Sequence, residues 1–233
     1  MPGPGHFDAH ADAYERGRPP YPPALWERLR ALELLGPGVR VADLGAGTGH
    51  ATGPMLDAGA AVLAVEPGEQ LAARLRRRWP AAEVVQATAE DADLAPGAFD
   101  LVVAATAVHW FDLGVVLPKV HRALAPGGHL AVWRNGYGDP EAPVTPFREG
   151  VGRIVARRGP RTPRPGPGEL DDAGWAEVLA GDGLFRVVHR DRFRWAVDLD
   201  ADQVRDLFTT FSDWTREEAD AAARAAARCG SAT

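Results

Sequence analysis

The sequence predicts an α/β fold with a doubly wound, mostly parallel sheet and helices on both of its faces. Through the first 135 residues, short apolar runs alternate with stretches in which apolar residues recur at helical spacing. Alternation of this kind places helices on both faces of a parallel sheet. The second observation is a glycine-rich segment, Gly45–Gly49, that directly follows the first apolar run. Ligands of such sheets bind at the carboxyl ends of the strands, where this segment is expected to lie.

The expected helices and strands follow one another in regular order up to residue 134. A helix is expected over residues 22–35, where leucines recur at helical spacing and Pro23 suits the first turn. The expected strands are short apolar runs at 39–43, 61–65, 83–86, 100–104 and 129–134. The helices between them cover 50–59, 68–79 and 114–124. Pro80 stops the second of these helices, and Pro126-Gly127-Gly128 forms a turn before the last strand.

Beyond residue 134 the alternation breaks. Residues 136–183 are rich in glycine and proline. We expect them to form a substrate cap with short helices over 146–157 and 174–180, and a surface linker is the alternative. Residues 185–199 are expected to form a further strand, because their apolar side chains alternate at Phe193, Trp195, Val197 and Leu199. Helices over 201–211 and 216–229 follow, so the expected sheet has six or seven strands.

Composition bounds the partners and the compartment. The 233 residues contain no apolar run long enough to span a membrane, and the first six lack the features of a secretory signal. Cys229 is the single cysteine, which excludes an internal disulfide. We therefore expect a cytoplasmic monomer or homodimer with no membrane partner. The net charge of −6 argues against a nucleic-acid partner, and the basic run at Arg74 and Arg76–Arg78 is read as a solvated helix end.

The segment Asp43-Leu44-Gly45-Ala46-Gly47-Thr48-Gly49 joins the first expected strand to a helix. Glycines at alternate positions let the backbone turn sharply and approach a ligand closely, and the helix that follows presents unpaired N–H groups. A dinucleotide fingerprint requires Gly-x-Gly-x-x-Gly, but His50 and Thr52 stand where the third glycine is needed in the two registers. The segment therefore indicates a different nucleotide site, and a purely structural turn is the alternative.

Glu66, at the end of the second expected strand, is the next candidate. A carboxylate at this position can accept two hydrogen bonds from a ribose diol. The glycine segment about twenty residues upstream favours this role over that of an exposed turn carboxylate. Glu66 by itself does not identify the nucleotide.

The segments that distinguish an S-adenosylmethionine site from an NAD site are residues 87–91, 105–112 and 124–128. Together with the glycine segment and with Phe7–Pro22, they resemble the class I S-adenosylmethionine-dependent methyltransferases, in the small-molecule branch described as methyltransferase type 11. The run His109-Trp110-Phe111-Asp112 is typical of a sub-branch of that family. The likeness covers residues 7–135 well and residues 185–214 loosely. It implies a Rossmann-like fold, to which the sequence adds the Gly/Pro-rich insert after the fifth expected strand.

The resemblance also implies a site for S-adenosyl-L-methionine, with S-adenosyl-L-homocysteine as product. Gly45, Ala46 and Gly47 would lie against the methionine part, and Asp43 would order the loop and reach the amino group through water. Relatives often carry Asp where Thr88 stands, and that Asp accepts a hydrogen bond from the adenine amino group. In this chain the backbone N–H of Ala89 could still donate to the adenine ring. The remaining contacts would come from Glu66 on the ribose, Pro67 on the adenine, Thr88, Ala89 and Glu90 at the adenine edge, Ala105 at the tip of strand four, and Tyr14 and Arg18 closing over the cofactor.

Methyl transfer from a sulfonium is an in-line displacement, so alignment and desolvation do most of the work. A general base is needed only when the acceptor carries a proton. His109 is the candidate base, because an unperturbed histidine has a pKa near 6.5 and the tip of strand four would face the methyl group. His109 and Trp110 are also candidate substrate contacts, and packing roles are the alternative for both. The spacing of histidine, cysteine and carboxylates shows no metal site.

We therefore predict a methyltransferase that transfers the methyl group of S-adenosylmethionine to oxygen, nitrogen or carbon of a small molecule. Its expected parts, within one domain, are an N-terminal lid and helix at 1–35, a cofactor-binding core at 36–135, a substrate cap at 136–183 and a C-terminal strand and helices at 184–233. One alternative is an NAD(P)-dependent oxidoreductase, which His50 and the His109-Trp110 segment oppose. Another is a methyltransferase-like fold used only for binding or regulation. A nucleic-acid methyltransferase is opposed by the acidic balance.

Overall fold

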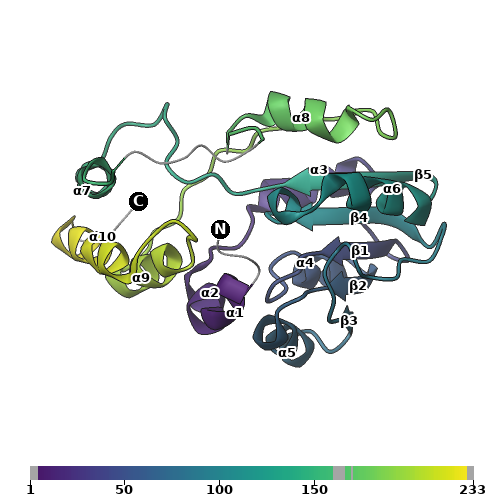
Figure 1. Cartoon of the computed structure of the whole chain (residues 1–233), viewed down its shortest axis with the longest axis horizontal. Helices are drawn as coiled ribbons and strands as arrows, with labels where there is room; N and C mark the ends of the chain where they lie inside the picture. The colour runs from purple at the N-terminus through teal and green to yellow at the C-terminus, as the bar shows by residue number, and fades with distance from the viewer. Residues whose placement is uncertain (1–4, 160–165, 169, 230–233) are drawn as a thin grey trace. The chain divides into compact units, whose positions relative to one another are not determined.

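The computed structural model describes residues 5–159, 166–168 and 170–229. The chain divides into two compact units (Figure 1). The first, here called the helical unit, comprises Met1–Pro20, Gly136–Pro165 and Arg194–Thr233. The second, the sheet unit, comprises Tyr21–Asn135 and Gly166–Phe193. The sequence expected to form a cap is thus shared between the two units, and its residues 160–165 and 169 lie outside the described residues, as do residues 1–4 of the expected lid.

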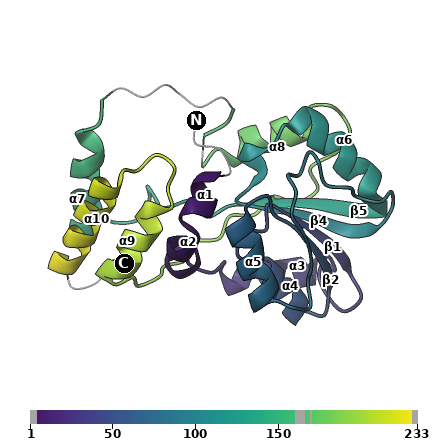
Figure 2. The same ribbon diagram turned by 60° about the horizontal axis from the view of Figure 1, so that its bottom comes forward.

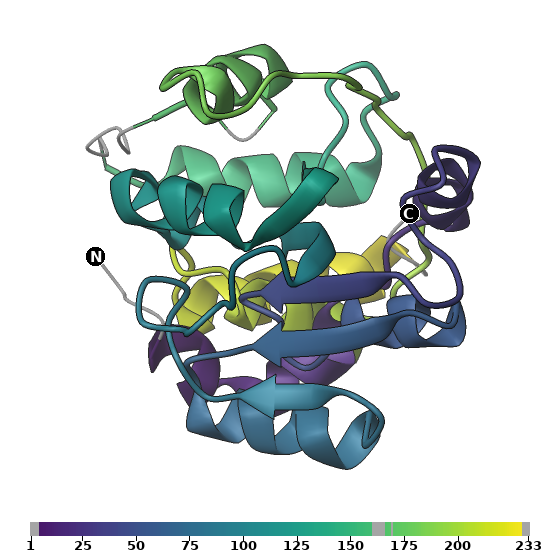
Figure 3. The same ribbon diagram turned by 90° about the vertical axis from the view of Figure 1, so that its right-hand side faces the viewer.

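The sheet unit is built on one parallel sheet, which confirms the predicted α/β class. Its five described strands lie in the order β3-β2-β1-β4-β5, and every pairing is parallel (Figure 3). The order reverses direction between β1 and β4, so their carboxyl ends form the switch point at which ligands of such sheets bind. The strand bounds are β1 (Arg40–Leu44), β2 (Ala61–Val65), β3 (Glu83–Val85), β4 (Phe99–Ala105) and β5 (Leu124–Trp133).

Helices cover both faces of this sheet because its strands are apolar on both sides. On β1, Val41 packs into one core with helices α3 and α4, while Ala42 packs into the opposite core with helix α6. Helix α5 lies on the α3–α4 side, where Leu75 contacts Ala64 of β2 (Figure 2). The helix bounds are α3 (Pro23–Ala31), α4 (Thr52–Asp57), α5 (Glu69–Arg78), α6 (Leu113–Ala123) and α8 (Asp172–Ala180), with one 3-10 turn, η1 (Val108–Trp110).

The expected strand over residues 185–199 is wrong, and the described sheet accordingly has five strands rather than six or seven. Residues 185–198 run without strand pairing. Phe185 packs against the core on one face of the sheet and Phe193 against the core on the other. The segment from Phe185 to Phe193 therefore passes from one face of the sheet to the other without pairing with a strand, whereas Leu199 packs in the core of the helical unit. Val187, Val188 and Trp195 remain exposed.

The helical unit is held by a separate apolar core. Val204, Leu207 and Phe208 of one helix are buried against the alanine face of another. Small residues allow close approach, since a Cβ on Gly17 would lie 2.4 Å from the backbone nitrogen of Leu207. The helices are α1 (Gly5–Ala9), α2 (Ala11–Gly17), α7 (Pro146–Ala156), α9 (Ala201–Thr209) and α10 (Arg216–Cys229). Among the described residues, no helix is both long enough and apolar enough to cross a membrane.

Candidate functional site

The glycine segment forms the turn between β1 and α4, as predicted. Gly45, Gly47 and Gly49 have φ angles of +71°, +59° and +89°, in the left-handed region that favours glycine. The N–H groups of Gly45 and Ala46 both donate to the carbonyl of Val65, at 2.8 and 3.0 Å, which ties the loop to the end of β2. A Cβ on Gly45 would stand 2.6 Å from that of Ala107, so this loop abuts the segment that follows β4. The loop therefore presents backbone rather than side chains at the switch point of the sheet.

Glu66 lies beside this loop at the carboxyl end of β2, where the sequence placed it. Its side chain is 5% exposed, and its carboxylate accepts hydrogen bonds from the N–H groups of Gly47 and Gly68, both at 2.8 Å. Each of the two bonds uses a different carboxylate oxygen. These two bonds fix the carboxylate beside the glycine loop. A contact between Glu66 and a ribose diol stays a prediction.

Asp43 is the most deeply buried acid of the site, with no exposed surface. The Thr52 hydroxyl donates to its Oδ2 at 2.7 Å, which joins the end of β1 to the first turn of α4. Its Oδ1 has no hydrogen-bond partner among the described residues. Burial raises the pKa of Asp43 from 3.8 to about 7, the Thr52 hydrogen bond opposes the rise, and the Glu66 carboxylate adds to it. The site thus holds an acceptor that favours a proton or a cationic partner.

The loop after β3 is fixed by its own side chains. The Thr88 hydroxyl donates to Asp91 Oδ2 at 2.9 Å and accepts from the Asp91 N–H at 3.1 Å. The Glu90 carboxylate accepts from the N–H of Asp112 at 2.8 Å, which links this loop to the one after β4. Ala89 is buried between them. The side chains of Thr88 and Glu90 thus shape the loop, and an adenine contact from this segment stays a prediction.

Lys119 is a residue of this site that the sequence reading missed. From α6, its ammonium donates to the carbonyls of Ala89, Glu90 and Ala92, with Nζ–O distances of 3.3 Å to the first and 2.9 Å to the last. It is the single lysine of a chain with 26 basic residues. A compact ammonium with three donors can serve three converging carbonyls, whereas the planar guanidinium of arginine suits carboxylates. The lone lysine was the signal available in the sequence.

The segment after β4 carries the predicted catalytic residue. Thr106 adopts a φ of +60°, its N–H donates to the carbonyl of Trp133 at 2.7 Å, and its hydroxyl lies 2.9 Å from that of Tyr21. The chain then enters η1, where the rings of His109 and Trp110 lie 4.9 Å apart and both residues are half-buried. Ala105 ends β4 directly before this segment. His109 is thus held at the tip of β4, and its role as a base stays a prediction.

Tyr14 and Arg18 belong to the helical unit. The Arg18 guanidinium donates to the hydroxyl of Thr210 at 2.9 Å and to its carbonyl at 3.3 Å. It also lies over the rings of Phe211 and Tyr14, 5.0 and 5.3 Å from their centroids. Within this unit the half-buried Arg18 links the ends of α2 and α9, and its contact with a cofactor stays a prediction. The described residues contain no group of three or more histidine, cysteine or carboxylate side chains that could hold a metal ion.

Comparisons with known proteins show a family match within the sheet unit. Residues 42–132, which run from β1 through β5, match a family described as "Methyltransferase domain". An uncharacterized methyltransferase of Mycobacterium tuberculosis is 40% identical over 132 residues, covering 55% of this chain and 52% of that protein. The chain thus matches about half the length of such relatives.

Two solved structures are among those similar to this chain. An S-adenosylmethionine-dependent methyltransferase from Mesorhizobium loti is 33% identical, covering 47% of this chain and 52% of that one, with a TM-score of 0.43. A candidate type II methyltransferase from Anaeromyxobacter dehalogenans is 31% identical, covering 64% of this chain and 68% of that one, with a TM-score of 0.49. The matched family includes the glycine loop, Glu66 and the segment after β4 in one stretch.

Proposed function

Since the chain belongs to the class I S-adenosylmethionine-dependent methyltransferases, we propose that it transfers the methyl group of S-adenosylmethionine to oxygen, nitrogen or carbon of a small molecule. The observation that carries the proposal is the join of the glycine loop to Glu66. The Gly47 N–H donates to the buried carboxylate at 2.8 Å, so a backbone cradle and a ribose acceptor form one rigid element. A turn that served the fold alone would not need a buried carboxylate at its centre.

The residues present fit the cofactor. Its ammonium group suits Asp43, whose buried Oδ1 has no partner among the residues that the structure describes. The methionine part can lie against the main chain of Gly45, Ala46 and Gly47. Gly45 and Gly47 have left-handed backbone and no Cβ atom, so no side chain from these two residues blocks its approach. The adenosine contacts proposed are Glu66 to the ribose hydroxyls, Pro67 against the adenine face and the N–H of Ala89 at the adenine edge.

The protein's contribution to this reaction is to position the acceptor against the methyl group and to exclude water. S-adenosylmethionine supplies an electrophilic methyl group on a sulfonium, with S-adenosylhomocysteine as the product. The acceptor atom must stand in line with the methyl–sulfur bond, a geometry worth several powers of ten in rate when it is held rigidly. His109 would take the proton of an acceptor that carries one, and Trp110 would shape the acceptor pocket. An acceptor without a proton would need neither.

Calorimetric titration with S-adenosylmethionine, S-adenosylhomocysteine and NADPH tests the proposal. We expect binding of the first two and none of NADPH. NADPH binding without a response to the other two would replace the proposal with an oxidoreductase, and cofactor binding without turnover of any acceptor would indicate a regulatory protein.

The variant Gly47→Val tests the loop itself. A β-branched side chain at a φ of +59° is strained and would occupy the space of the cofactor, so we expect binding to be abolished. Gly38→Val is the matched control, because Gly38 has a φ of +80° and its Cβ would meet nothing within 4 Å. Both variants carry similar backbone strain, and the loop assignment requires that only Gly47→Val lose the cofactor. A folded Gly47→Val protein with unchanged affinity would refute the assignment.

The proposal extends to the compartment and the assembly. A cytoplasmic monomer or homodimer is in keeping with one exposed cysteine, Cys229, and no disulfide. The net charge of −6 supports a small-molecule acceptor over a nucleic acid. Size-exclusion chromatography with light scattering measures the assembly directly.

A further inference from the structure

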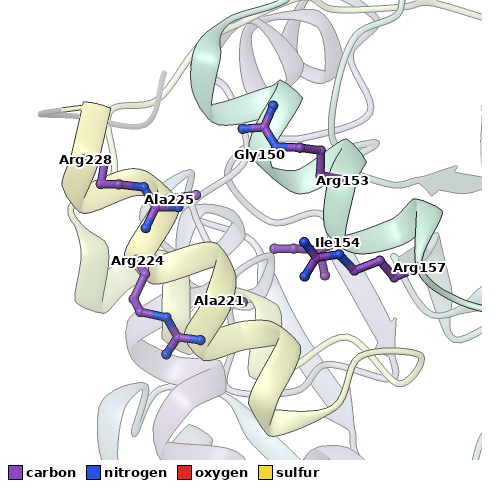
Figure 4. Close-up of a pocket in the computed structure, with 8 residues that line it drawn as sticks. All are labelled: Gly150, Arg153, Ile154, Arg157, Ala221, Arg224, Ala225 and Arg228. Atoms are coloured by element: carbon purple, nitrogen blue, oxygen red, sulfur yellow. The ribbon is translucent and has the colours of Figure 1, made fainter.

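A pocket of about 230 Å³ lies between α7 and α10 of the helical unit (Figure 4). Four arginines line it, Arg153 and Arg157 from α7 and Arg224 and Arg228 from α10. The other lining residues are small or apolar: Gly150, Ile154, Ala221 and Ala225. All charged side chains that line the pocket are therefore basic.

The sequence builds this arrangement by helical spacing. Arg153 and Arg157 are four residues apart, as are Arg224 and Arg228, so each pair projects from one face of its helix. The two helices can approach closely because a Cβ on Gly150 would already lie 3.0 Å from that of Ala225. Close packing at this point brings the two arginine pairs to opposite sides of a single hollow, as Figure 4 shows.

These arginines differ from their neighbours in how their charge is compensated. Elsewhere in the helical unit, Arg16 pairs with Asp206, Arg158 with Glu218 and Arg205 with Asp220, at 2.7 to 2.9 Å. In the pocket, the ion-pair partner of Arg153 among the described residues is Glu149, at 3.8 Å between two exposed side chains.

Arg157, Arg224 and Arg228 have no carboxylate within 4.0 Å among the described residues. Like charges around one hollow repel each other, and a bound anion would relieve that repulsion. The contrast is marked in a protein whose net charge is −6.

We propose that the α7–α10 pocket binds a small phosphate-bearing anion. Guanidinium groups match phosphate oxygens with paired N–H donors, and Arg is the side chain suited to such recognition. The volume of about 230 Å³ lies below the roughly 300–1,000 Å³ of pockets for drug-sized ligands. It therefore fits a compact anion such as a diphosphate group rather than a whole nucleotide. The pocket lies within the helical unit, so this inference is independent of the proposed methyl transfer.

Calorimetric titration of the full chain with sodium pyrophosphate tests the inference, at low salt and again at physiological ionic strength. We expect saturable binding with one site, weakened by salt because the contacts are ionic. The double variant Arg157→Gln/Arg224→Gln removes one unpaired arginine from each helix, and we expect at least tenfold weaker binding. Both side chains are exposed, so the fold should survive, which the melting temperature and circular dichroism will show.

The control variant Arg77→Gln/Arg122→Gln removes the same net charge from exposed helix positions of the sheet unit. Its affinity for pyrophosphate should stay within twofold of the wild type. Equal losses in the two double variants would show that net charge alone attracts the anion, and this would overturn the site. Failure of the wild type to bind at millimolar pyrophosphate, or equal binding of citrate, would overturn the phosphate assignment.

Discussion

Asp43→Asn is predicted to stabilise the protein at alkaline pH and to do so less as the pH falls. In the folded protein burial holds the pKa of Asp43 at about 7, against 3.8 for the free side chain. Between these two values the folded state keeps a proton that the unfolded state has released. The free energy of unfolding therefore falls as the pH rises through this window, and it reaches its plateau above about pH 7. Asparagine is neutral throughout and does not follow this decline.

The size of the effect follows from that window. From 3.8 to about 7 the loss amounts to about 4 kcal/mol, and about 3 kcal/mol of it falls between pH 5 and pH 8, at 1.36 kcal/mol per pH unit. Asparagine can still accept the Thr52 hydrogen bond, but its amide N–H replaces an oxygen that has no partner among the described residues. An unsatisfied buried donor costs about 1–3 kcal/mol. At pH 8 the variant should therefore gain about 1–3 kcal/mol, and at pH 5 it should be near or below the wild type.

Urea unfolding followed by circular dichroism at pH 5 and pH 8 measures these differences. Asp100→Asn is the matched control, because the Arg40 guanidinium holds the pKa of the exposed Asp100 carboxyl at about 2. Asp100 is ionised at both pH values, so its replacement should lower stability by the same amount at each. The reasoning on Asp43 is refuted if the difference between Asp43→Asn and wild type is also the same at pH 5 and pH 8.

Three further predictions concern residues of the sheet unit. Lys119→Met keeps an unbranched apolar side chain but removes the donors to three carbonyls. We expect the free energy of unfolding to fall by about 1–3 kcal/mol, S-adenosylmethionine to bind more weakly in calorimetry, and the amides of residues 88–92 to exchange faster. Unchanged amide exchange in that segment would contradict the anchoring role of Lys119. Gly53→Ala places a Cβ 2.2 Å from the Trp79 ring and should cost about 1–3 kcal/mol in urea unfolding, whereas Gly152→Ala, whose Cβ meets nothing within 4 Å of its helix position, should stabilise by about 0.5–1 kcal/mol. At Thr106, with its φ of +60°, Gly should be more stable than Ala by about 1–2 kcal/mol, and a more stable Ala variant would argue against backbone strain there.

The sheet was predictable because its signals are local. Each strand from β1 to β4 was expected from a short, mainly apolar run, and the structure places them within about two residues of the expected bounds. The glycine loop and Glu66 come together because consecutive parallel strands end at the same edge. The strand expected at 185–199 was wrong because alternation of apolar residues does not show whether another strand is available for pairing, and one of the alternating residues, Trp195, is exposed.

Other features depend on contacts between distant parts of the chain. Lys119 reaches carbonyls about 27 to 30 positions away in sequence, and nothing local marks that contact. The paired arginines of α7 and α10 are visible at helical spacing in the sequence, but the packing of Gly150 against Ala225 that joins them is not. The left-handed backbone at Thr106 is likewise imposed by its neighbours, since threonine does not favour it.

The two buried acids of the site, Asp43 and Glu66, are electrostatically coupled. Glu66 is fixed by two backbone N–H donors, and its charge adds to the burial that raises the pKa of Asp43. Without a ligand, one carboxyl of such a pair is favoured in its protonated form near neutral pH. A ligand that places an ammonium group beside Asp43 and hydroxyl donors beside Glu66 would interact favourably with both carboxylates. It would thereby offset the free-energy cost of burying the charged form of Asp43. S-adenosylmethionine carries these two groups, so its binding should release a proton from Asp43 at pH 6, and calorimetry in buffers of different ionisation enthalpy would count that proton. Binding without proton release at this pH would mean that Asp43 does not face the ammonium group.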